Sequence, residues 1–106
     1  MELSVGHISE LKGLFLLVKS SLETRFHLSS DESIRLINQY YSKFLNAEFC
    51  QKYNFPPQSL ELLEHWGYPA VADRVYYYEA LGHEPNEMEF IQWDNMMYRN
   101  RRKGEE

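Results

Sequence analysis

The chain has 106 residues, of which 43% are hydrophobic and 25% charged, and its formal net charge is −5. This length suits one domain with a single modest core, and the composition is that of a globular protein rather than a disordered one. The negative charge argues against nonspecific nucleic-acid binding, because the phosphate backbone is engaged through clustered lysines and arginines.

A first helix is predicted near the N-terminus. Apolar residues recur at intervals of three and four from Ile8 to Phe26, which is the period of an amphipathic helix of four to five turns. Leu14, Leu16 and Leu17 widen its apolar face beyond one stripe. We therefore expect this helix to be covered on two sides.

The second predicted helix begins with a capping box. Ser29 is followed three residues later by Glu32, so the hydroxyl can accept from a free amide of the first turn. Its apolar positions continue as far as Phe49, with Asn46 as a point of interruption. Pro56 must end any helix by about residue 54, because a residue before proline is pushed out of the α region.

Three further helices are predicted, and prolines and glycines mark their ends. Pro57 suits the first turn of a third helix that ends at Gly67, and Pro69 suits the first turn of a fourth that ends at Gly82. Pro85 then opens a fifth. The expected fold class is all-α, a compact bundle of about five helices, with two long N-terminal helices and three shorter C-terminal ones.

The fifth helix leads into a charged end. Asn86 and Glu89 repeat the spacing of a capping box, so they support its start. Residues 1–100 are expected to form a single helical domain. Residues 101–106 are expected to form a flexible charged tail, as chain ends without an apolar anchor often do.

The most informative pattern is the charge of the C-terminal half. Between Glu61 and Asp94 there are eight acidic residues and one basic residue, Arg74, together with several large aromatic residues. Acidic patches attract and select basic partners, and tryptophan and tyrosine are enriched at interface hot spots. The sequence therefore predicts a protein-binding surface that comprises Trp66, Tyr68, Tyr76, Tyr77, Glu61, Glu64 and Glu79.

The tyrosine run is the centre of this prediction. Three consecutive residues of an α-helix span about 200° of its circumference, so Tyr76, Tyr77 and Tyr78 cannot all face one core. With Val75 and Tyr78 on the inner side, Tyr77 is expected to point outward and Tyr76 to lie at the margin. Packing of the rings over neighbouring helices is the alternative interpretation.

Residues for catalysis or metal binding are sparse. Glu61 and His65 are four apart and share a helix face, but the second Glu-x-x-His element of a di-iron bundle is absent. Cys50 is the only cysteine and is expected to be buried and inert. No phosphate-binding glycine loop or nucleophile elbow occurs. We therefore expect no enzyme activity, no metal and no cofactor.

Two known helical recognition motifs do not fit. The segment Leu63–Pro69 resembles the loop of the ubiquitin-associated domain, which has Met-Gly-Phe or Met-Gly-Tyr between its first two helices. Trp66 replaces that methionine and the next helix is longer, so none of that family's binding residues is carried over. A helix-turn-helix over Ser59–Gly82 would present Asp73 and Glu79 to DNA, which is the wrong charge.

A basic cluster at the C-terminal end offers an alternative function. Arg99, Arg101, Arg102 and Lys103 lie within five residues. They could contact phosphate in a nucleic-acid-associated accessory factor. The simpler interpretation is that cations at a helix C-terminus stabilise its dipole.

The sequence as a whole indicates an interaction protein of the cytoplasm. A single cysteine excludes an intrachain disulfide framework, and neither a signal peptide nor an apolar run of membrane-spanning length is visible. The expected function is that of an adaptor, inhibitor or immunity-type factor that engages a protein with a basic surface. Self-association, giving a homo-oligomer, is a second expected use of the exposed apolar surface.

Overall fold

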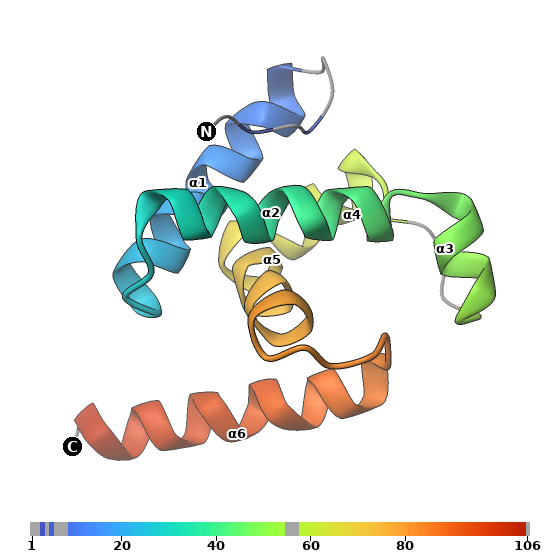
Figure 1. Cartoon of the computed structure of the whole chain (residues 1–106). Coiled ribbons are helices and arrows are strands. Elements are labelled where there is room, and N and C mark those ends of the chain that lie inside the picture. Colours follow the sequence, from blue (N-terminus) through green and yellow to red (C-terminus); the bar gives the residue numbers. More distant parts are fainter. Residues whose placement is uncertain (1–2, 4, 6–8, 55–57, 106) are drawn as a thin grey trace.

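The computed structural model describes residues 3, 5, 9–54 and 58–105, with side chains as far as Tyr98. Within these ranges the chain forms six α-helices and no strand: α1 (Ser9–Arg25), α2 (Ser30–Phe44), α3 (Ala47–Lys52), α4 (Leu60–Trp66), α5 (Tyr68–Val75) and α6 (Glu87–Glu105). A π-helical turn, η1 (Tyr76–Ala80), continues α5. The predicted all-α fold is confirmed (Figure 1).

Side-chain caps fix several helix starts. Ser29 Oγ accepts from the Glu32 amide at 3.1 Å and begins α2, as predicted. Asn46 Oδ1 accepts from the amides of Glu48 and Phe49, so the interruption at Asn46 separates α2 from α3. A free amide at a helix start needs such an acceptor. These ends are decided within one turn of chain.

The start of α4 differs from the prediction. Pro57 was expected to open this helix, but Pro57 lies outside the described residues and α4 begins at Leu60. Ser59 is the cap, since its Oγ accepts from the Leu62 amide at 3.3 Å. The serine side chain, which satisfies a free amide of the first turn, therefore fixes the start of α4.

The helices pack around α5. It contacts α1 and α4, and its continuation η1 contacts α2. In Figure 1, α2 and α6 lie on opposite sides of α5. The core is built from buried apolar side chains of all these elements except α3, among them Phe15, Val18, Leu22, Ile37, Tyr40, Phe44, Leu63, Val71, Val75 and Phe90.

Coverage of α1 is narrower than expected. Phe15 and Val18 are fully buried, but Leu16 and Leu17 are more than half exposed. Helices α2 and α5 pack against α1, and the side that carries Leu16 and Leu17 is left open. Two helices therefore cover α1, but Leu16 and Leu17, on which the prediction of a second covered side was based, are exposed. None of the helices in the described part of the chain has both the length and the apolar character to cross a bilayer.

The last helix is the longest, not one of three short ones. It has 19 residues and continues to Glu105, so residues 101–105, expected as a flexible tail, are helical. Between Glu87 and Lys103 the sequence contains no proline and no glycine. Good helix formers such as Met, Glu, Gln and Arg let the helix continue beyond its last apolar contact.

Gly13 lies on the exposed side of α1, and a Cβ there would meet no atom within 4 Å. Replacing Gly13 with alanine is expected to raise the free energy of unfolding by about 1 kcal/mol, because alanine has less backbone freedom to lose. Urea unfolding checks this. Gly82, at φ 74°, is the matched control: Gly82→Ala should lower stability by on the order of 1 kcal/mol. If Gly82→Ala raised the free energy of unfolding instead, this would contradict the left-handed backbone conformation of Gly82.

Candidate functional site

The tyrosine run is part of the core. Tyr77 and Tyr78 are each 3% exposed and Tyr76 is half-buried, so the predicted outward position of Tyr77 is wrong. The amide of Leu81 bonds to the carbonyl of Tyr76, five residues back. A π turn has more residues per turn than an α-helix, so consecutive side chains are spread over a narrower arc.

Helix α6 covers the remaining side of the run. Tyr77 packs edge-on to Phe90, with ring centroids 5.5 Å apart, and against Trp93 at 5.1 Å. Its other neighbour is the His83 ring, stacked at 4.2 Å. Tyr76 stacks on Phe26 at 4.0 Å. Tyr76 and Tyr77 therefore join helices to one another and do not form an exposed binding surface.

Ion pairing and exposure divide seven of the eight acidic residues into two groups, with Asp94 in neither. Lys43 Nζ donates to Glu79 at 2.9 Å, and the Glu79 side chain is only 1% exposed. Burial raises the pKa of Glu79. Asp73 and Glu87 are likewise paired with arginines. Glu79 thus serves the fold and is not free for a partner, contrary to the prediction.

Four carboxylates remain at the surface. They are Glu61 and Glu64 of α4, Glu84 of the loop before α6, and Glu89 of α6. All four are exposed, and none makes an ion pair with a described side chain. The unpaired acidic charge of the C-terminal half is therefore concentrated on these two helices and the loop.

Arg74 joins three helices at this end of the molecule. It is 7% exposed, and its guanidinium lies 3.7 Å from the centre of the Trp66 ring and 4.4 Å from that of Phe90. Glu87 supplies the opposite charge through an ion pair. A buried cation is stable only with such partners. Trp66 of α4, Arg74 of α5 and Glu87 of α6 are thereby fixed relative to one another.

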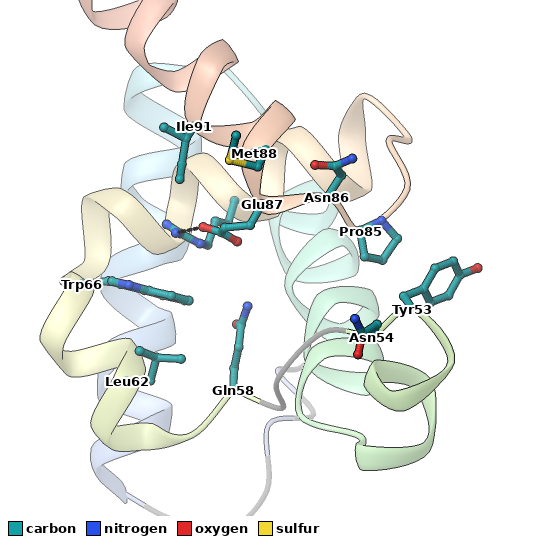
Figure 2. Close-up of a pocket in the computed structure, with 11 residues that line it drawn as sticks. Tyr53, Asn54, Gln58, Leu62, Trp66, Pro85, Asn86, Glu87, Met88 and Ile91 are labelled. Carbon is teal, nitrogen blue, oxygen red and sulfur yellow. Dashed lines mark hydrogen bonds and ion pairs between the residues drawn. The ribbon is translucent and has the colours of Figure 1, made fainter.

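A cavity of about 660 Å³ opens next to this group (Figure 2). We call it the α4–α6 cavity. Leu62 and Trp66 form one side, while Tyr53, Asn54 and Pro85 lie opposite, as Figure 2 shows. The remaining lining residues are Gln58, Arg74, Asn86, Glu87, Met88 and Ile91. A mostly apolar hollow with a few polar groups is the usual form of a binding pocket.

Gln58 brings a polar group to this cavity. Its residue is 4% exposed, and the hydroxyl of Tyr40 donates to Gln58 Oε1. The amide nitrogen Nε2 is buried and has no hydrogen-bond partner among the residues that the structure describes. In Figure 2 the side chain of Gln58 points into the space beside Trp66 and Glu87. Unpaired buried donors are rare in proteins, so this one calls for a ligand or water.

The cavity unites only part of the predicted site. Trp66 is half-buried and forms its wall. Tyr68 is exposed but lines a different, shallower hollow of about 220 Å³ with Leu17 and Arg25. Trp66 and Tyr68 therefore do not share one hollow, although they are two residues apart.

The sequence also contains a signal that the prediction missed. Helix α6 has an inner stripe, Phe90 and Trp93, and a second apolar set that includes Met88, Ile91 and Tyr98, all exposed. Met88, Ile91 and Tyr98 are spaced by three and seven residues, so they share a side of the helix. Met88 and Ile91 also line the cavity, so the hollow continues onto α6.

The groups considered for chemistry are dispersed. Cys50 is fully buried as predicted, and burial raises the pKa of its thiol. Among the described residues no three side chains of His, Cys, Asp and Glu are grouped so as to hold a metal ion. The side chains of Arg99, Arg101, Arg102 and Lys103, the predicted nucleic-acid contacts, lie outside the described residues.

Comparison with models of known protein families gave no match, and comparisons with curated proteins and with solved structures gave none either.

A pair of carboxyl groups attaches α6 to α5. Asp94 of α6 lies next to Asp73 of α5, and Arg25 of α1 is ion-paired with Asp73. Asp73 Oδ2 and Asp94 Oδ1 are both buried and have no hydrogen-bond partner among the described side chains. Burial, followed by the neighbouring Asp94 carboxyl, raises the pKa of Asp73 to about 7 despite Arg25. Near neutral pH a protonated Asp73 can donate a hydrogen bond to Asp94.

This pair predicts a dependence of stability on pH. The Asp73 pKa is raised from 3.8 to about 7 on folding, so the native state holds an extra proton between these values. The stabilisation that this proton on Asp73 adds to the free energy of unfolding is fully present below about pH 4 and is lost as the pH rises to 7. In Asp94→Asn the amide can donate to Asp73 without this proton, so the loss should shrink. Urea unfolding at pH 5 and pH 8 measures it.

Glu84→Gln is the control for Asp94→Asn, because it removes an exposed carboxylate without an ion-pair partner among the described side chains. Its pH dependence should match that of the unmodified protein. If Asp94→Asn also matches, Asp73 does not donate a hydrogen bond to Asp94.

Proposed function

We propose that this protein is a non-enzymatic interaction module that binds a basic segment of a partner protein at its α4–α6 face. This face comprises α4, residues 81–86 and the exposed side of α6. Trp66 and Ile91 serve as apolar contacts at the cavity, and the exposed carboxylates select for positive charge. Adaptor, inhibitor and immunity-type roles all follow from such binding, through scaffolding or occlusion.

The observation that supports this proposal is the combination of unpaired charge and exposed apolar side chains on the same elements. Glu61, Glu64, Glu84 and Glu89 have no described cation beside them, and Ile91 is 44% exposed at the rim of the cavity. Surfaces of small proteins rarely keep apolar side chains grouped in this way without a use.

The two features act at different stages of binding. Exposed carboxylates speed encounter with a basic partner, and this effect weakens as salt screens the charges. An apolar anchor that fills the cavity slows dissociation, because the filled hollow excludes water. The expected cytoplasmic location remains part of the proposal. A second copy of the chain is the competing occupant of the α6 surface.

Photo-crosslinking in the native cell tests the location of the contact. A crosslinking residue at position 91 is expected to capture a distinct partner protein, and one at position 10 on α1 is not, since Glu10 is exposed on another element. Mass spectrometry identifies the product. Capture of nucleic acid alone, or of another copy of this chain alone, at position 91 would contradict the proposal.

Charge reversal tests the acidic residues. Glu64→Lys with Glu84→Lys should weaken partner binding by about tenfold at low salt, because two attractions become repulsions. The effect should shrink at high salt. Glu10→Lys with Glu48→Lys is the matched control, with the same change in net charge at other exposed sites. Equal weakening in both double variants would show that only net charge matters.

A further inference from the structure

The polar groups of the α4–α6 cavity indicate which side chain of a partner would fit there. Gln58 is more than nine-tenths buried, and its Nε2 donor has no partner in the described part of the chain. Tyr40 holds the other end of the same amide by donating to Oε1. The Nε2 donor is therefore the group left for something that enters the cavity.

We propose that the α4–α6 cavity binds a phenol ring, the side chain of a tyrosine in the partner segment, with its hydroxyl at Gln58 and Glu87. This inference rests on the proposed function and deepens it by naming the anchor residue.

The apolar walls of the cavity suit an aromatic ring. The indole of Trp66 forms one side, with Leu62 on the same helix, and Met88 and Ile91 of α6 line it as well. Aromatic rings gain most from stacked or edge-on contacts of this kind. A cavity of about 660 Å³ has room for a phenol ring and part of the chain beside it.

Two complementary polar groups of the cavity suit a phenol hydroxyl. Gln58 Nε2 is a donor, and the carboxylate of Glu87, which lines the same cavity, is an acceptor. A phenol hydroxyl accepts one hydrogen bond and donates another, so it can serve both. The terminal torsion of glutamine is broad, so a turn of the amide would bring the buried Nε2 to the surface of the cavity.

Other anchors fit less well. A phenylalanine would fill the hollow but leave Gln58 Nε2 without a partner. An anionic group would find Arg74 already neutralised by Glu87, with four exposed carboxylates on the surrounding elements. A lysine ammonium only donates hydrogen bonds, so it would leave the Gln58 Nε2 donor without an acceptor. The phenol alone among these matches both the walls and the polar end.

Titration with p-cresol and toluene, followed by ¹H–¹⁵N NMR, tests the proposal on the whole protein. We expect p-cresol to shift the side-chain amide of Gln58 and the indole N–H of Trp66 saturably. Toluene, which lacks the hydroxyl, should bind at least about tenfold more weakly, because the amide stays unpaired. Equal binding of both compounds, or no saturable shift with p-cresol, would overturn the phenol site.

Two variants check where the compound binds. Ile91→Trp fills the cavity from an exposed position, so the fold is retained and p-cresol binding should be lost. Gln58→Met keeps the length of the side chain but removes the amide, so the preference for p-cresol over toluene should disappear. Circular dichroism monitors folding of both variants. Unchanged p-cresol binding in folded Ile91→Trp would place the compound elsewhere and overturn the site.

Peptides separate this inference from the proposed function. A short peptide with a tyrosine between pairs of lysines is compared with its phenylalanine analogue and with a serine-flanked tyrosine peptide. A preference for tyrosine over phenylalanine supports the phenol site, and its absence overturns it. A preference for lysine over serine flanks supports the basic partner. Failure of the second comparison alone would reject the proposed function while the phenol site stands.

Discussion

The guanidinium of Arg74 is buried between the rings of Trp66 and Phe90 and is neutralised by Glu87. A charge can be held inside a protein only where aromatic faces and an opposite charge replace its water. These partners come from α4 and α6, so the same residue that needs them also fixes the two helices relative to α5. Arg74 thereby positions the residues of α4 and α6 that line the cavity.

The acidic residues of the C-terminal half serve two purposes, and burial decides which. Asp73, Glu79 and Glu87 lie against cations of other helices and attach α5, η1 and α6 to the rest of the fold. The exposed acids on α4 and α6 have no such partner among the described side chains and give the surface its charge. Asp94 belongs to neither group, because its neighbour Asp73 is another carboxyl, whose pKa it helps to raise.

The tyrosines of η1 likewise support the site without forming it. Tyr77 packs on Phe90 and Trp93 and thereby anchors α6, while the surface of α6 keeps Met88 and Ile91 at the cavity. Tyr76 and Tyr77 were predicted as binding residues, but they support the helices that carry the binding face. The proposed partner contacts α6, whose position depends on these tyrosines, and does not contact the tyrosine rings themselves.

The sequence by itself determined the helices and most of their ends. Ser29, Asn46 and Asn86 cap the residues that follow them within one turn, so local spacing was enough to place the starts of α2 and α6 and the interruption at Asn46. Tertiary structure alone decided that Tyr77 is buried, that Glu79 meets Lys43, and that Gln58 lies at a cavity. Each of these depends on a residue from a distant helix or on a π turn, and the period of an α-helix contains no information about either.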